Sequence, residues 1–300
     1  MSILRFSDDL YLIDLPQKLE GFRKFIGAWV YAGEECTFVV DPGPKSTIPH
    51  LVASLRDIGI RDVDYVLITH IHIDHAGGLG EFLRHFENAE VLVNERGKEH
   101  LINPEKLWRG SLKVLGKVAE HYGRIDPVPP ERFVDSIDGI EVLYTPGHAV
   151  HHQSYIVGDY LFVGEAFGVT HEVWDDVYQR PATPPKFVHE IAMSSVKKLK
   201  SVGKKKACMG HFGMLENSLD VAEYAEKQLN LWTDAVFDAI CCSSVDDFES
   251  VCRDVVHELL NKDPRFSNLE KLDADVRKRE EYFTRNSIKG MYEYVKENRL

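Results

Sequence analysis

Long hydrophobic runs are missing from this chain of 300 residues. No apolar stretch approaches the ~20 residues that a membrane-spanning helix needs. The amino terminus, residues 1–8, lacks the basic region and apolar core of a signal peptide. The five cysteines have no regular spacing, which is typical of thiols in a reducing compartment and not of a disulfide framework. Together these absences predict a cytoplasmic protein that does not associate with a membrane.

Positive charge is also scarce. Lys and Arg number 36 against 48 Asp and Glu, which gives a formal net charge of -12. The short basic clusters at 197–198 and 204–206 are typical of solvated helix ends or loops. Because an acidic surface repels the phosphates of nucleic acids, we expect no nucleic-acid partner and a small-molecule substrate instead.

Two common catalytic signatures do not occur. The sequence has no Gly-x-Ser-x-Gly nucleophile elbow and no Gly-x-x-x-x-Gly-Lys-(Ser/Thr) phosphate loop. Its chemistry must therefore come from other residue types.

The most informative segment is His70-Ile71-His72-Ile73-Asp74-His75. It follows the apolar run 66–69, which reads as a buried strand, so its polar side chains lie at the carboxyl end of that strand. His70 and His72 are two residues apart and point to the same side of an extended segment, while Asp74 and His75 follow where the chain turns. Imidazoles and a carboxylate suit zinc, iron or manganese. Solvated loop histidines are the alternative, but this density of ligands favours a metal site.

The segment resembles the HxHxDH signature of the metallo-β-lactamase superfamily. Three further elements of the family pattern occur in the expected order along the chain. They are the turn Asp41-Pro42-Gly43 after a strand, the segment Thr145-Pro146-Gly147-His148, and His211 within Gly210-His211-Phe212-Gly213. The resemblance covers residues 3 to 215, and the ordered set is more specific than any single motif.

The resemblance implies one or two divalent metal ions, with zinc preferred and iron or manganese compatible. In the family pattern, His70, His72 and His148 would hold one metal. Asp74, His75 and His211 would hold the other.

A bridging carboxylate is the one place where the chain departs from the pattern. The family has an aspartate after a leucine-phenylalanine strand, whereas this chain has Leu161-Phe162-Val163-Gly164-Glu165. Asp159 is the rival, but it falls in the predicted turn between strands 153–157 and 160–163, at the far end of that hairpin. We therefore assign the bridging position to Glu165, whose extra methylene reaches about 1.5 Å further.

The ligands indicate hydrolysis by a metal-activated hydroxide, with Asp74 as the catalytic residue that orients the water. The resemblance to glyoxalase II and the lactonases implies a small ester, thioester or lactone as the substrate. Two alternatives stay open: a mononuclear iron oxidoreductase like the persulfide dioxygenases, and a phosphodiesterase of a small substrate. A purely structural metal is disfavoured, because structural zinc sites are closed by four ligands.

The resemblance also implies an αββα sandwich, which the alternating strand and helix patterns support. We expect a metal-binding domain over residues 1–215 and a helical extension over 216–300. The extension shows three helical patterns, over 219–242, 245–260 and 272–295. It is expected either to cap the active site or to form a homodimer interface.

Residues 169–185 interrupt the regular pattern. Trp174, Tyr178 and Arg180 lie there among prolines and acidic residues, directly after Glu165. We expect a loop that forms a substrate wall, with Arg180 able to bind a carboxylate. A packed crossover loop is the alternative.

Overall fold

The computed structural model describes residues 3–242 and 247–300 as two compact units. The first unit comprises Met1–Tyr144, His151–Gly158 and Gly210–Phe212, and the second comprises Thr145–Val150, Asp159–Met209 and Gly213–Leu300. These units are defined by contacts between residues in space. The predicted domain boundary after residue 215 is based on sequence motifs and helical patterns instead, and it stays a prediction.

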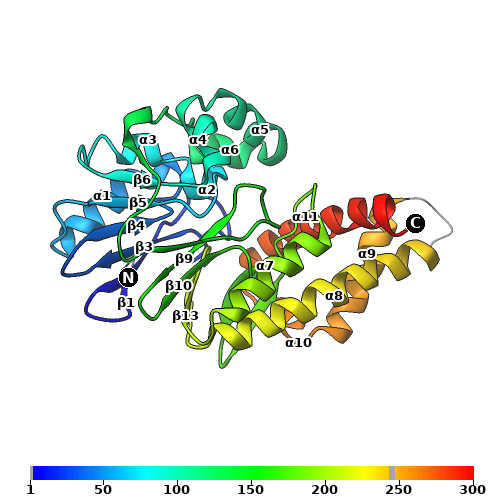
Figure 1. Ribbon diagram of the computed structural model, residues 1–300. Coiled ribbons are helices and arrows are strands. Elements are labelled where there is room, and N and C mark those ends of the chain that lie inside the picture. Colours follow the sequence, from blue (N-terminus) through cyan, green and yellow to red (C-terminus); the bar gives the residue numbers. More distant parts are fainter. Residues whose placement is uncertain (1–2, 243–246) are drawn as a thin grey trace. The chain divides into compact units, whose positions relative to one another are not determined.

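A seven-stranded sheet in the order β1-β2-β3-β4-β5-β6-β7 forms the centre of the first unit (Figure 1). Strands β1 to β4 pair antiparallel, whereas β4 to β7 pair parallel. Because β4 and β5 are parallel, the residues that follow them leave the sheet at the same edge. The strands are β1 (Ile3–Arg5), β2 (Leu10–Asp14), β3 (Gly27–Ala32), β4 (Thr37–Val40), β5 (Tyr65–Leu67), β6 (Glu90–Leu92) and β7 (Phe133–Val134). A further antiparallel pair is formed by β8 (Glu141–Tyr144) and β9 (Gln153–Val157).

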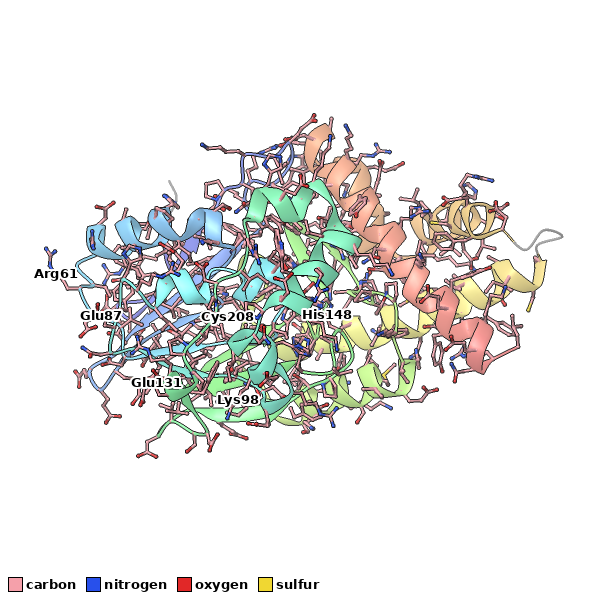
Figure 2. The ribbon with its side chains drawn as sticks, turned by 90° about the horizontal axis from the view of Figure 1, so that it is seen from above. Arg61, Glu87, Lys98, Glu131, His148 and Cys208 are labelled. Carbon is pink, nitrogen blue, oxygen red and sulfur yellow. The ribbon has the colours of Figure 1, made fainter. Side chains whose placement is uncertain are left out.

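Two helical segments of this unit are short. Gly116 adopts φ 54° and ψ -122° and divides the helical residues 105–122 into α5 and α6. Residues 79–82 form a single helical turn, α3. The helices are α1 (Ile48–Asp57), α2 (Ile73–Ala76), α3 (Leu79–Phe82), α4 (Glu95–Ile102), α5 (Glu105–Leu115) and α6 (Lys117–Tyr122). Charged side chains such as Arg61, Glu87 and Glu131 lie exposed at its periphery (Figure 2).

In the second unit, β10 (Tyr160–Gly164) pairs parallel with β13 (Lys206–Met209), which pairs antiparallel with β14 (Met214–Leu215). Cys208 on β13 is buried (Figure 2). Residues 169–180 form a β-hairpin of β11 (Val169–Val173) and β12 (Asp176–Arg180). The predicted loop is therefore wrong here, because Val169, Val173 and Tyr178 bury their side chains and stabilise a regular pair of strands.

Helices make up the rest of the second unit, where α8 packs against α7, α9 and α11, and α9 also packs against α11 (Figure 1). The three helical patterns predicted at the carboxyl end are confirmed by α8 (Ser218–Cys242), α9 (Phe248–Lys262) and α11 (Ala274–Asn298). Residues 245–246, with which the second pattern begins, lie outside the described residues. The other helices are α7 (His189–Ser201) and the short α10 (Pro264–Ser267). Among the described residues, no helix is long and apolar enough to cross a membrane.

Candidate metal centre

The histidine-rich segment leaves β5 and turns at once into helix α2. His72 occupies the N-cap position, and its carbonyl accepts hydrogen bonds from the N–H groups of His75 (3.0 Å) and Ala76 (2.9 Å). His70 and His75 are fully buried. The extended part thus positions His70 and His72, and the helical turn positions Asp74 and His75.

Two glycines tie this turn to the turn after β4. Gly43 donates its N–H to the carbonyl of His75 (3.0 Å), and Gly78 donates its N–H to the carbonyl of Gly43 (2.8 Å). A side chain on Gly78 would place its Cβ 2.8 Å from that carbonyl oxygen and 2.5 Å from Ile48. Only glycine allows this approach, so the two turns hold each other in place.

Asp41 orients two of the histidines. Its Oδ2 lies 2.9 Å from Nδ1 of His75, and because a carboxylate only accepts, Nδ1 donates and Nε2 is the nitrogen with a lone pair for a cation. The same Oδ2 accepts the hydroxyl hydrogen of Thr69 at 2.5 Å, and the Thr69 oxygen lies 3.0 Å from Nδ1 of His70. One buried carboxylate therefore fixes His75 directly and His70 through Thr69. The sequence placed Asp41 in the family's turn but gave it no such role. A buried carboxylate at the end of the strand beside the histidines was the available signal.

Three ligand residues come together within the first unit. Ligand atoms of Asp74, His75 and His211 lie within 4.8 Å of one another. His211 is 5% exposed, and its ring stacks on Phe25 with centroids 4.2 Å apart. Two imidazoles and a carboxylate are a donor set that suits a borderline divalent cation.

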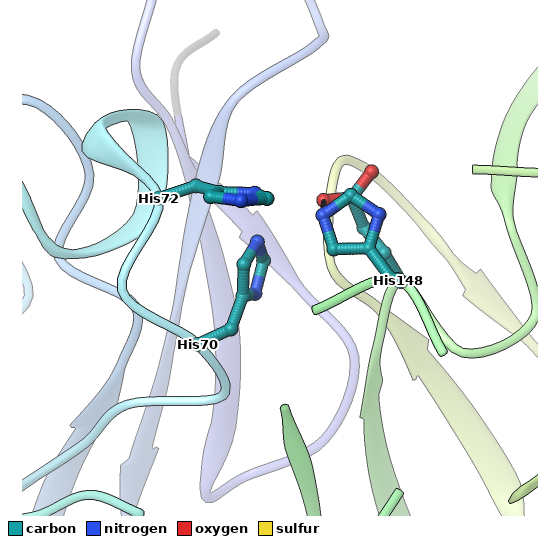
Figure 3. A group of neighbouring side chains, drawn as sticks. His70, His72 and His148 are labelled. Carbon is teal, nitrogen blue, oxygen red and sulfur yellow. Dashed lines mark ion pairs between the residues drawn. The ribbon is translucent and has the colours of Figure 1, made fainter. Parts of the chain in front are cut away.

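His70 and His72 lie beside one another on the segment after β5 (Figure 3), with ring centroids 4.7 Å apart. Two more histidines of the first unit adjoin them. The His152 ring is fully buried, 5.3 Å from that of His70. His151 accepts a hydrogen bond from the N–H of Ile71 at 3.4 Å. These contacts fit supporting roles around His70 and His72.

The second unit holds the remaining predicted ligands, His148 (Figure 3) and Glu165. Nδ1 of His148 lies 3.0 Å from the carbonyl oxygen of Ala182, which only accepts, so Nδ1 is the donor. The other nitrogen, Nε2, lies 2.9 Å from Oε2 of Glu165. If the ring is neutral, the lone pair of Nε2 therefore faces a lone pair of the Glu165 carboxylate. Such a contact needs a cation, either a proton or a metal ion, so the pair fits a metal site.

The predicted substrate residues lie on the β11–β12 hairpin, and the structure gives them different environments. Trp174 is 83% exposed and adopts φ 52° at the tip. Tyr178 is fully buried, and Arg180 is buried with its Nε donating to Oε2 of Glu280 at 2.6 Å. Because Arg180 already pairs with an internal carboxylate, the prediction that it binds a substrate carboxylate gains no support.

Comparison with known proteins was made by sequence and by fold. Residues 24–211 match the family model described as the metallo-beta-lactamase superfamily. A metallo-beta-lactamase fold-containing protein of Sulfurisphaera tokodaii is 30% identical over 233 residues, which cover 73% of this chain and 84% of that protein. An N-acyl homoserine lactonase of Bacillus thuringiensis is 31% identical over 180 residues, which cover 57% of this chain and 64% of the lactonase.

The fold agrees with these matches. The crystal structure of a metallo-beta-lactamase family protein from Thermus thermophilus superposes with a TM-score of 0.66 at 20% identity, covering 98% of this chain and 95% of that one. The predicted α/β fold with a carboxyl-terminal helical region is thereby confirmed. On the matched residues, the relatives and the fold, the chain belongs to the metallo-beta-lactamase superfamily.

Proposed function

We propose that the protein is a metal-dependent hydrolase of a small ester, thioester or lactone. The observation that carries the proposal is the buried Asp41, which aims Nε2 of His75 and, through Thr69, Nε2 of His70. Such orienting carboxylates are typical of metal sites, because they fix the tautomer and raise the basicity of the ligand. The N-acyl homoserine lactonase relative supports a lactone within this substrate class.

For the ligands we propose the family's two sets. His70, His72 and His148 would hold one ion, and Asp74, His75 and His211 the other, with Glu165 in the bridging position. The grouping of Asp74, His75 and His211 and the approach of Glu165 to His148 support this assignment. Zinc is the preferred ion, since neutral imidazoles and carboxylates suit it.

When bound, the ion would lower the pKa of water towards about 7 and polarise a carbonyl oxygen. The chain's own groups provide orientation. Asp74 is only partly buried, and its carboxylate can accept a hydrogen bond from the attacking water and so align it with the substrate carbonyl. The buried imidazoles of His70 and His75 are held rigidly, so their geometry need not reorganise during the reaction.

A substrate panel tests this proposal. Purified protein should hydrolyse members of a set of γ-lactones, acyl thioesters and aryl esters. Hydrolysis should disappear after chelation and return with added Zn²⁺ or Mn²⁺. His75→Ala should abolish the activity, while His121→Ala, at an exposed position of α6, should leave it unchanged. Activity that survives chelation, or that survives His75→Ala, contradicts the proposal.

Two further predictions accompany the function. We propose that the protein works in the cytoplasm, which fits its five free cysteines. A homodimer through the carboxyl-terminal helices also stays a prediction, and sedimentation equilibrium of the full chain tests it.

A further inference from the structure

The segment between β2 and β3, residues 15–26, folds into a compact loop of the first unit. The N–H of Leu15 donates to the carbonyl of Ile26 at 2.8 Å and closes the loop at its base. A Cβ on Gly43 would lie 2.4 Å from Cδ1 of Leu15, so this base packs tightly on the turn that carries Asp41. The loop is therefore held against the same turn that orients the proposed ligands.

Phe25 of this loop contacts a proposed ligand. It is buried, and its ring lies nearly parallel to that of His211, with centroids 4.2 Å apart and an angle of 15° between the planes. The ring of His75 lies 5.2 Å from that of His211, at 75°. One face of the His211 imidazole therefore rests on an aromatic hydrocarbon, while a ligand atom of that imidazole groups with those of Asp74 and His75.

The position of Phe25 is fixed by its neighbours in the loop. Phe22 packs edge-on against its ring, with centroids 5.5 Å apart at 90°. Lys24 adopts φ 46°, in the left-handed region that non-glycine residues seldom occupy. The backbone of Lys24 forms a hydrogen bond with the carboxylate of Asp14. Because such a strained conformation persists only where the surrounding structure enforces it, the loop presents Phe25 to His211 in one defined way.

This stacking favours the ion-bound form of His211. The face of an aromatic hydrocarbon carries partial negative charge. An imidazole that binds a divalent cation loses electron density, so this face attracts it more strongly than it attracts the neutral ring. Both rings are buried, and the attraction is therefore weakly screened by water. An aliphatic side chain in place of Phe25 could pack against the imidazole but would not supply this charge.

We propose that Phe25 is a positioning residue for an ion held by Asp74, His75 and His211. Its ring fixes the plane of the His211 imidazole and stabilises the electron-poor form that the imidazole takes when it binds the ion. This inference rests on the metal site of the proposed hydrolase. It is tested by metal binding in the absence of any substrate, which keeps it separate from the test of hydrolysis.

Stepwise fluorination of Phe25 tests the electrostatic role with almost no change of shape. Mono-, di- and trifluorophenylalanine are introduced at this position, because each fluorine draws negative charge away from the ring face. The affinity for Co²⁺ is measured on metal-free protein by competition with a chromophoric chelator. It should fall with each added fluorine, by about threefold to thirtyfold over the series. Where two Co²⁺ ions bind, the binding step that is lost in His211→Ala is the one that should respond.

Phe38 provides the matched control. It is also a buried phenylalanine in a stacked pair, and its partner Tyr31, whose ring lies 4.9 Å away at 20°, is not a proposed ligand. The same fluorinated residues at this position should leave the Co²⁺ affinity unchanged. Phe25→Leu should lower the affinity, whereas Phe38→Leu should not. If Phe25→Leu does not fold, the two fluorinated series decide alone.

The outcomes separate the two proposals. A Co²⁺ affinity that stays constant along the Phe25 series overturns the role of Phe25, and so does an equal decline along the Phe38 series. A decline confined to Phe25 supports that role even if no ester, thioester or lactone is hydrolysed, in which case the hydrolase function alone fails. An unmodified protein that binds no Co²⁺ overturns the ligand set and the role of Phe25 with it.

Discussion

Asp41 and His75 form a buried pair in which Oδ2 of the carboxylate lies 2.9 Å from Nδ1 of the imidazole. They belong to turns after neighbouring parallel strands, and the hydrogen bonds of Gly43 and Gly78 join those turns. The pairing of β4 with β5 places Asp41 beside His75. Because the carboxylate accepts from Nδ1, it determines that Nε2 is the imidazole nitrogen that can bind a cation.

The substitution Asp41→Asn should weaken metal binding. The oxygen of the new amide can still accept from the N–H of Thr69, but the amide nitrogen cannot accept from Nδ1 of His75. We expect metal affinity to fall by about tenfold to a hundredfold, as is typical for the loss of such an orienting partner. Competition with a chromophoric chelator measures this. Asp62→Asn, at an exposed position, is the control, and equal affinities in the two variants would contradict the role of Asp41.

Glu165 and Asp159 offer a second comparison. Glu165→Ala should lower metal affinity by more than about tenfold, because its carboxylate faces Nε2 of His148. Asp159→Ala should leave metal content unchanged, since Asp159 is exposed in the turn after β9. Elemental analysis of the two proteins, purified side by side, decides between the carboxylates. The reverse pattern would assign the ligand to Asp159.

Two glycines in helices should respond oppositely to alanine. On α11, a Cβ at Gly290 would clash with the carbonyl oxygens of Thr183 and Pro184, so Gly290→Ala must displace that segment or the helix. We expect a loss of about 1–3 kcal/mol in the free energy of unfolding. On α5, Gly110 has nothing within 4 Å, and Gly110→Ala should gain about 0.5–1 kcal/mol. Urea denaturation measures both, and a stabilised Gly290→Ala would contradict the packing.

Acid should destabilise the protein through His171. Burial lowers the pKa of His171, and the nearby Arg279 lowers it further, although Glu280 acts in the opposite direction. The folded state therefore binds fewer protons than the unfolded state below the ordinary pKa of 6.5. Stability from this group is complete above that value and is lost as the pH falls below it towards the lower pKa of the folded state. His171→Asn should flatten the decline of Tm between about pH 7 and pH 5, and an unchanged slope would contradict this account.

Glu280 contributes at lower pH. Burial alone would raise the pKa of its carboxyl, but the charges of Arg180 and Arg279 and the hydrogen bond with His171 hold the pKa well below its usual range. Its stabilising effect is present above pH 4.5 and is lost as the pH falls towards the lower folded value. Part of the acid sensitivity that remains in His171→Asn should therefore appear below pH 4.5.

Much of the fold was predictable because its signals are local. The ordered motifs from Asp41 to His211 indicated the family, and helical periodicity gave α8, α9 and α11. The hairpin at 169–180 was missed, because its charged sequence and the three prolines that follow it within 181–185 resemble a loop, and because its burial depends on distant residues. The buried pairing of Arg180 with Glu280 spans 100 positions, and no local pattern reveals such a partner. The buried amide contacts of Gln228 were equally hidden, since Asp263 and Gln179 lie 35 and 49 positions away in the sequence.

The most direct test of the central claim is the rate of ester, thioester or lactone hydrolysis as a function of metal ions bound per chain. Zn²⁺ is added in steps to protein that has been freed of metal, and bound metal and rate are measured on the same samples. We expect a rate that starts at the uncatalysed background and rises with bound metal until one or two ions are held. A rate already at its maximum with no metal bound would contradict metal-dependent hydrolysis.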